Sequence, residues 1–253
     1  MEPPHEVIPR AEDAVLSAER APAEASWSFR KFLVTGSGRS GTRYTALLLS
    51  ELGLDVRHES LGSEGIVSWY VAADSDSVPY GPPCSRLVFG HVFHQVRHPL
   101  RVIPSLATLR PETWAFVARH VPCSPDDPPL VRCAKLWLHW NLLAERRAEW
   151  RYRIEDLPDM FDEFCRRFGV RCDRRALERL PRDLNTRPPR LATWFSRLES
   201  REYLYRLRVG ARLRERLLVA GGERSTLSWE TLDLVDPNLC RRIHLKAREY
   251  GYE

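Results

Sequence analysis

The chain has 253 residues, a length that suffices for one large α/β domain or two small ones. Its hydrophobic content of 43% is typical of a soluble globular protein. Its net charge of +5 comes from 39 basic and 34 acidic residues, without the clustered basic and aromatic runs of nucleic-acid-binding proteins. No stretch approaches the roughly 20 apolar residues of a membrane span, and the N-terminus lacks the basic start and apolar segment of a secretory signal. The 6 cysteines include no C-x-x-C pair, so we expect reduced thiols in a cytoplasmic protein rather than a disulfide framework or a zinc site.

Residues 1–27 differ in composition from the rest of the chain. Three prolines precede Arg10, and acidic residues outnumber basic ones. This composition predicts a flexible acidic N-terminal tail followed by a single α/β domain over residues 28–253. A lid or a dimerisation arm is the alternative role for the tail.

A strand, a glycine-rich loop and a helix are predicted in succession over residues 32–52. The apolar run that begins at Phe32 indicates a short buried strand, and the stretch from Tyr44 to Leu52, before Gly53, indicates a helix. Between them lie three glycines, at 36, 38 and 41. Glycines let backbone N–H groups turn toward an anion at a helix N-terminus, so this arrangement predicts a phosphate-binding loop.

The loop departs from the ATP-binding pattern. Gly36 and Gly41 have the spacing G-x-x-x-x-G, but Thr42 and Arg43 follow where that pattern has Lys and Ser or Thr. The main cation, Arg39, lies inside the loop instead. The sequence therefore predicts a loop for an anion whose chemistry needs no magnesium.

Two motifs resemble those of the sulfotransferases that use 3′-phosphoadenosine-5′-phosphosulfate (PAPS). The stretch Gly-Ser-Gly-Arg-Ser-Gly-Thr ending at Thr42 resembles their 5′-phosphosulfate loop, although many members carry Lys where Arg39 stands and a second Thr where Arg43 stands. Arg97, followed eight residues later by Ser105, resembles their 3′-phosphate motif.

This resemblance implies a three-layer, P-loop NTPase-like sulfotransferase fold with a central parallel sheet, and PAPS as the donor co-substrate with no metal required. The residues that it implies for donor binding are Gly38, Arg39, Ser40, Gly41, Thr42, Arg43, Arg97 and Ser105.

The second predicted strand, over residues 54–58, ends at two candidate general bases. Transfer to a hydroxyl needs a proton acceptor near the attacking oxygen, and a carboxylate or an imidazole can serve. Because neighbouring side chains of a strand point to opposite faces, only one of the two can face the donor. Glu59 is our first candidate and His58 the second.

The elements predicted over residues 62–109 include those that carry Arg97 and Ser105 of the second motif. Residues 62–69 indicate a short helix and residues 74–83 a loop. One or two strands over residues 87–96 carry Arg97 to the sheet edge that also holds Gly36, and a helix from Leu100 to Leu109 carries Ser105. The histidines at 91 and 94 would lie on opposite faces of a strand, so a shared metal ion is not expected.

The remaining elements complete an alternating βα pattern, which predicts a parallel sheet with helices on both faces. We expect a helix from Leu130 to Glu149, a central strand over 152–156, and helices over 159–168 and 174–180. Ser228 and Asp236 mark the starts of two C-terminal helices, the last of which ends at Gly251.

Several further residues have two possible roles. Trp69, Tyr80, Trp137 and Trp140 suit either the core or the wall of an acceptor pocket. The resemblance implies a ligand-covering loop near residues 185–190, where Arg187 or Arg190 would cover the 3′-phosphate.

The predicted function is sulfuryl transfer from PAPS to the hydroxyl or amine of a small-molecule or carbohydrate acceptor. Glu59 or His58 would take the acceptor's proton as it attacks sulfur in line, and Arg39 would stabilise the charge on the departing bridging oxygen. A P-loop kinase of a small molecule and a catalytically degenerate nucleotide-binding module are the alternatives.

Overall fold

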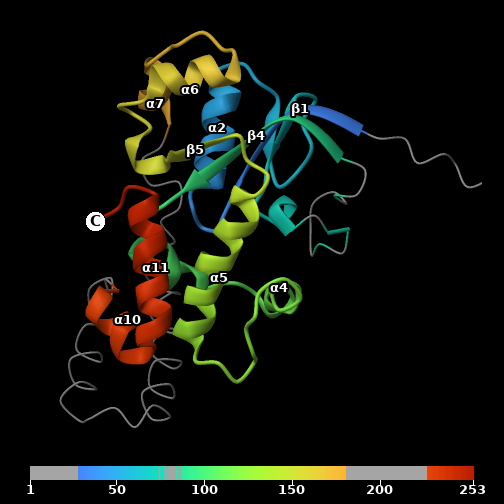
Figure 1. The fold of residues 1–253 in the computed structure, drawn as a ribbon. Coiled ribbons are helices and arrows are strands. Elements are labelled where there is room, and N and C mark those ends of the chain that lie inside the picture. The colour runs from blue at the N-terminus through green and yellow to red at the C-terminus, as the bar shows by residue number, and fades with distance from the viewer. Residues whose placement is uncertain (1–27, 74, 77, 79–83, 85–86, 181–226) are drawn as a thin grey trace, which may run out of the picture.

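A five-stranded parallel sheet lies between two layers of helices (Figure 1). The computed structural model describes residues 28–73, 75, 76, 78, 84, 87–180 and 227–253. The predicted α/β architecture, with a parallel sheet and helices on both faces, is confirmed.

The strands are β1 (Ser28–Gly36), β2 (Val56–His58), β3 (Gly65–Val67), β4 (Leu87–Val96) and β5 (Trp150–Arg153). The α-helices are α2 (Thr42–Glu51), α3 (Pro99–Leu106), α4 (Pro111–Val117), α5 (Pro129–Glu145), α6 (Phe161–Phe168), α7 (Arg175–Arg179), α10 (Trp229–Val235) and α11 (Pro237–Glu249). Two short 3₁₀ turns, η2 and η3, cover Tyr70–Ala73 and Ile154–Asp156.

The strand order β2-β3-β1-β4-β5 creates a divergence of the chain beside β1. After β1 the chain runs toward β2 and β3, whereas after β4 it runs toward β5 on the other side. In open parallel sheets, a crevice forms outside the carboxyl ends of two strands whose connections diverge in this way. Gly36 and Gln95 are register partners at these ends of β1 and β4.

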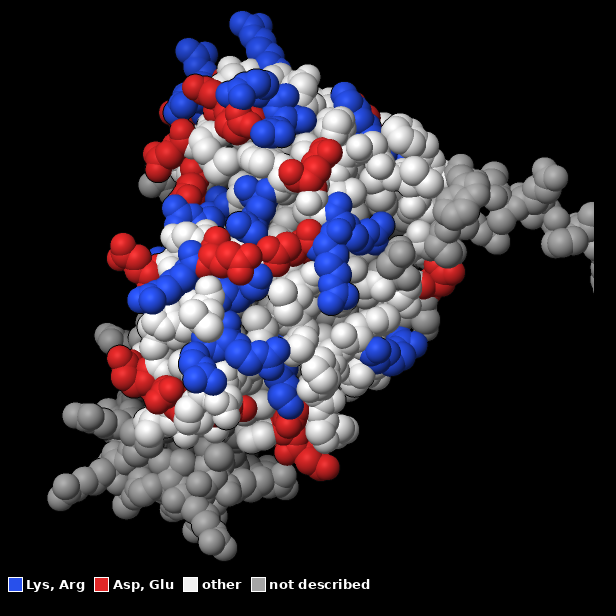
Figure 2. Space-filling view, viewed as in Figure 1, with Lys and Arg blue, Asp and Glu red and all other residues white. Residues whose placement is uncertain are grey.

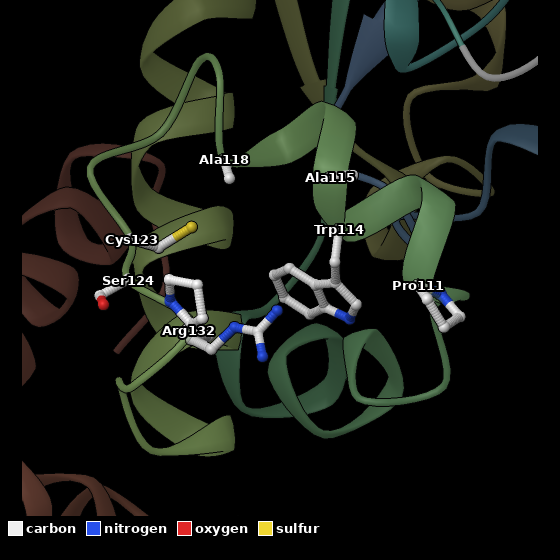
Figure 3. Close-up of a pocket in the computed structure, with 8 residues that line it drawn as sticks. Pro111, Trp114, Ala115, Ala118, Cys123, Ser124 and Arg132 are labelled. Atoms are coloured by element: carbon white, nitrogen blue, oxygen red, sulfur yellow. The ribbon is translucent and has the colours of Figure 1, made fainter.

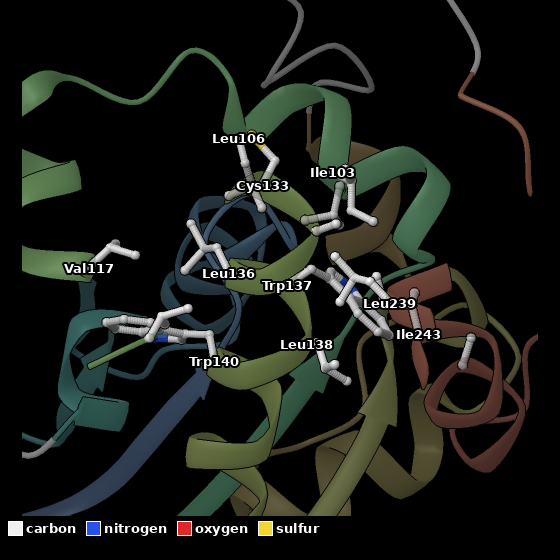
Figure 4. Close-up of a cluster of buried hydrophobic side chains, with 14 of the residues drawn as sticks. Ile103, Leu106, Val117, Cys133, Leu136, Trp137, Leu138, Trp140, Leu239 and Ile243 are labelled. Carbon is white, nitrogen blue, oxygen red and sulfur yellow. The ribbon is translucent and has the colours of Figure 1, made fainter. Parts of the chain in front are cut away.

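Each face of the sheet has its own hydrophobic core. One core packs α2, α6 and α7 against β1 and β4, and includes Phe32, Leu48 and Phe164. The other core lies among α3, α4, α5, α10 and α11. Figure 4 shows Trp137 and Trp140 inside this second core, and both side chains are fully buried. They are therefore core residues, and the alternative reading as an acceptor-pocket wall is wrong for both.

The predicted short helix over residues 62–69 is wrong, because strand β3 occupies this segment. β3 lies between β1 and β2, and all three of its residues are buried. A side chain at Gly65 would place Cβ 2.2 Å from the carbonyl oxygen of Phe32, so only glycine permits this strand to pair so closely. The helical turn follows later, at η2.

The predicted central strand over residues 152–156 is also wrong in its position. β5 ends at Arg153 and pairs only with β4, at the edge of the sheet. The exposed Arg151 suits such a strand, because charged side chains discourage pairing of an edge with another chain.

Several helix boundaries differ from the sequence-based expectation, among them the start of α6 at Phe161 rather than residue 159. The first helix begins at Thr42 rather than Tyr44, and α5 ends at Glu145 rather than Glu149. Helix α3 ends at Leu106, so Ser105 lies in its last turn.

The surface of the described residues mixes the two kinds of charge. Figure 2 shows basic and acidic side chains interspersed over the face viewed, in keeping with ion pairs such as Arg179–Glu51 and Lys246–Glu145. Among the described residues, no helix is both long enough and apolar enough to cross a membrane.

Candidate functional site

The loop between β1 and α2 turns tightly through residues 37–41. Arg39 and Gly41 both have left-handed backbone conformations, with φ of 67° and 98°. The Ser40 amide donates a hydrogen bond to the Ser37 carbonyl at 3.2 Å. At Gly36, an added Cβ would lie 2.1 Å from the carbonyl oxygen of Gln95, so the start of the turn requires glycine.

The loop ends at the N-terminus of α2 with unsatisfied donors. No side chain caps this helix, and the amides of a first helical turn have no intrahelical acceptor. The Ser40 side chain is fully buried, and its hydroxyl has no hydrogen-bond partner among the described residues. Unsatisfied amides, a helix dipole and a buried hydroxyl together suit an anion.

The buried amide side chain of Gln95 stabilises the loop through hydrogen bonds. Gln95 Nε2 donates to the Ser40 carbonyl at 2.7 Å, and Gln95 Oε1 accepts from the Tyr152 hydroxyl at 2.8 Å. The Thr45 hydroxyl also donates to this Oε1 atom. The sequence reasoning missed Gln95, although a polar residue within the apolar run of β4 was the available signal.

Arg97 meets the glycine loop directly. Its Nη1 atom lies 3.3 Å from the carbonyl oxygen of Arg39 and donates a hydrogen bond to it. The predicted neighbourhood of the two motifs at one sheet edge is therefore confirmed. Burial lowers the pKa of the Arg97 guanidinium, partly offset by the nearby carboxylate of Glu155. The guanidinium of Arg97 keeps its charge at neutral pH, because arginine loses its proton only in strongly basic solution.

The segment after Arg97 is held by hydrogen bonds and ring contacts to two residues that are distant in the sequence, Glu155 and Tyr252. Glu155 Oε1 accepts from the His98 amide at 3.0 Å, and Glu155 Oε2 accepts from the Tyr252 hydroxyl at 2.9 Å. The rings of His98 and Tyr252 pack edge to face, with centroids 5.0 Å apart. Neither Glu155 nor Tyr252 was predicted, because their link to Arg97 depends on long-range packing.

Ser105 lies near the Arg39 side chain, to which it is linked through the Thr108 hydroxyl. Arg39 Nη2 donates to Thr108 Oγ1 at 2.7 Å, and that hydroxyl donates to the Ser105 carbonyl at 2.9 Å. The Ser105 hydroxyl itself donates to the Val102 carbonyl at 2.7 Å, which leaves its oxygen able to accept but its proton engaged.

His58 and Glu59 lie on the same side, contrary to the expected alternation. His58 Nε2 is 3.7 Å from Glu59 Oε1 and 3.1 Å from Thr42 Oγ1. The expectation is wrong because β2 ends at His58 and Glu59 takes a left-handed conformation, with φ of 54°, which turns its side chain back. The two candidate bases and the start of α2 therefore form one contiguous group.

Both of these residues have shifted pKa values. Burial raises the pKa of Glu59 to about 7, although hydrogen bonds from the Ser68 hydroxyl and the Trp69 amide oppose the shift. Burial and the positive charge of Arg43 lower the pKa of His58 to about 4. A carboxyl with a pKa near neutrality is suited to proton transfer, whereas His58 is uncharged at neutral pH.

Trp69 connects Glu59 to the glycine loop. Its amide donates to the Glu59 carboxylate, and its indole lies 3.3 Å from where a Cβ on Gly38 would stand. Its side chain is buried in the core, and its carbonyl accepts from Trp140 Nε1 at 2.7 Å. Tyr80, Arg187 and Arg190, named as candidates from the sequence, lie outside the described residues, as does the 1–27 segment.

The three histidines near Arg97 have structural partners. His91 pairs with Glu149, His94 Nε2 is 3.0 Å from Asn141 Oδ1, and His98 Nδ1 accepts from the Leu100 amide at the start of α3. Within the described part of the chain, no group of three or more His, Cys, Asp or Glu side chains could hold a metal ion.

Comparison of the chain with protein-family models, with curated proteins and with solved structures finds no match.

Proposed function

We propose that this protein is a PAPS-dependent sulfotransferase with a P-loop NTPase-like sulfotransferase fold. The observation that carries the proposal is the 3.3 Å hydrogen bond from Arg97 Nη1 to the Arg39 carbonyl. It joins two motifs that are nearly sixty residues apart, at the crevice between β1 and β4. A donor with phosphates at both its 5′ and 3′ positions needs two cationic side chains close together, and Arg39 and Arg97 supply them.

The residues around the crevice fit such a donor. The amides at the start of α2, the buried hydroxyl of Ser40 and the guanidinium of Arg39 would hold its 5′-phosphosulfate end. Arg97 would hold its 3′-phosphate, and the Ser105 hydroxyl would donate to the same phosphate after turning away from the Val102 carbonyl. Each charge-assisted hydrogen bond of this type contributes roughly 1.5–3 kcal/mol.

The donor supplies a sulfuryl group activated by its anhydride link to phosphate. Glu59 accepts the proton of the acceptor hydroxyl on its Oε1 atom, which has no hydrogen-bond partner among the described residues, since Oε2 already accepts from Ser68. Because its pKa is about 7, roughly half of the Glu59 carboxyl groups are ionised at neutral pH and able to accept a proton. As the acceptor oxygen bonds to sulfur, the bond from sulfur to the bridging oxygen breaks, and Arg39 would neutralise the charge on that oxygen of the departing adenosine 3′,5′-bisphosphate.

The decisive experiment is calorimetric titration with adenosine 3′,5′-bisphosphate, followed by a transfer assay with radiolabelled PAPS and a panel of sugars and small alcohols. We expect binding without magnesium, transfer to at least one acceptor, and roughly 10- to 100-fold weaker binding for Arg97→Met. Arg101→Gln is the control, because this exposed arginine of α3 lies near Arg97 but is not among the residues that the resemblance implies for donor binding.

Three outcomes would overturn the proposal. Magnesium-dependent binding of ATP in preference to the bisphosphate would favour a kinase. Binding of the bisphosphate without transfer to any acceptor would favour a degenerate nucleotide-binding module. Equal losses for Arg97→Met and Arg101→Gln would show only a general attraction between the basic surface and an anion.

A further inference from the structure

A cavity of about 340 Å³ lies between α4 and the start of α5 (Figure 3). Its wall is mostly apolar and includes Pro111, Trp114, Ala118 and Pro125. Figure 3 shows the indole of Trp114 and the guanidinium of Arg132 side by side in this wall. None of its lining residues belongs to the glycine loop, to the end of β2 or to Arg97.

Arg132 is the unusual member of this wall. The central carbon of its guanidinium lies 4.4 Å from the centroid of the Trp114 ring, which is stacking distance. Its Nε atom is buried and has no hydrogen-bond acceptor among the described residues. The nearby carboxylate of Asp127 is occupied by Lys135 Nζ at 2.7 Å, and no described carboxylate forms an ion pair with Arg132.

A buried guanidinium donor without an acceptor is costly unless a ligand supplies one. A guanidinium presents several donors in one plane and binds a carboxylate or a similar anion with paired hydrogen bonds. The indole face and the prolines offer the opposite kind of surface, suited to a flat apolar body. The volume lies at the small end of the range for ligand pockets.

We propose that this cavity binds a small, planar, apolar monoanion, whose anionic group contacts Arg132 and whose ring lies against Trp114. The site is separate from the crevice between β1 and β4 and does not depend on the function proposed for that crevice.

Calorimetric titration with 2-naphthoate, and with the neutral 2-naphthalenemethanol of nearly the same shape, tests this site in the full-length protein. We expect naphthoate to bind at least roughly 10-fold more tightly than the alcohol, because one charge-assisted hydrogen bond is worth that much. Arg132→Met should abolish this preference, Arg132→Lys should retain part of it, and Trp114→Ala should weaken both probes.

Arg110→Met is the matched control. This arginine precedes α4, is exposed beside Glu112 and does not line the cavity, so the variant loses the same charge nearby. A folded Arg132→Met protein, judged by its circular dichroism, that binds naphthoate like the Arg110→Met protein would overturn the proposal. So would wild-type protein that binds neither probe at millimolar concentration, or that binds both equally.

Discussion

At the scale of single residues, the conformation of Glu59 has the largest consequence for the candidate site. A left-handed backbone is costly for a residue with a side chain, roughly 1–2 kcal/mol. The hydrogen bonds from Ser68 and Trp69 hold the carboxylate in place and offset that cost. The same conformation brings Glu59 to His58, so one backbone feature assembles the pair of titratable groups.

The opposite pKa shifts of this pair predict opposite effects on stability. Between pH 4.5 and about 7, the folded protein keeps a proton on Glu59 that the unfolded chain has released, so this contribution to the free energy of unfolding falls as the pH rises. For His58, the contribution is complete above pH 6.5 and is lost as the pH falls toward about 4. In the wild-type protein the two trends partly cancel.

Urea denaturation at a series of pH values separates the two trends. From pH 5 to pH 7.5, the stability of Glu59→Gln should rise relative to wild type by at least about 1 kcal/mol, since one pKa unit corresponds to about 1.4 kcal/mol. His58→Asn should show the reverse, a relative stability that falls as the pH rises from 4 to 6.5. Variants whose profiles run parallel to wild type would contradict the assigned shifts.

At the scale of elements, the site depends on where each helix begins. Helix α2 starts without a side-chain cap, which leaves its first-turn amides to the loop, whereas α11 starts with a complete cap. The Asp236 carboxylate accepts from the Leu239 amide at 2.9 Å, and Pro237 follows at the first helical position. Through Leu239 and Ile243, α11 then packs into the core that contains α5.

Replacing the cap of α11 should destabilise the protein measurably. We expect Asp236→Ala to lower the free energy of unfolding by roughly 0.5–2 kcal/mol, because the Leu239 amide loses its acceptor. Asp236→Asn keeps a side-chain oxygen at the same place and should retain most of the stability. Chemical denaturation measures both, and an Asn variant as unstable as the Ala variant would count against the capping explanation.

At the scale of the whole molecule, the neighbourhood of Arg97 is assembled from distant segments. The glycine loop, β4, η3 and the last residues of the chain meet there through the contacts of Arg39, Gln95, Glu155 and Tyr252. Figure 1 shows the C-terminus beside the end of α11, and the Tyr252 hydroxyl bonds to Glu155 of η3. Tyr252 therefore contacts the segment beside Arg97, although 155 positions separate the two residues in the sequence.

This arrangement predicts different outcomes for two tyrosines of the same short segment. Tyr252→Phe should lower the free energy of unfolding by about 1 kcal/mol. It should also weaken binding of adenosine 3′,5′-bisphosphate, because Glu155 then holds the His98 segment less firmly.

Tyr250→Phe serves as the control, because its hydroxyl donates to Glu145 at 3.2 Å, away from Arg97. It should cost similar stability and leave the affinity unchanged, as calorimetry and denaturation can measure. Equal effects of the two variants on affinity would refute a special link between Tyr252 and Arg97.

The sequence by itself determined the α/β class, the glycine turn and the starts of the two C-terminal helices. These features follow from residues within a few positions of one another, such as the apolar run before Gly36 and the Asp-Pro pair at the start of α11. Only the tertiary structure decided the insertion of β3 between β1 and β2 and the edge position of β5. It also decided the burial of Trp137 and Trp140 and the meeting of His58 with Glu59. These features depend on which distant segments pair and pack, and a local pattern of side chains carries no information about that choice.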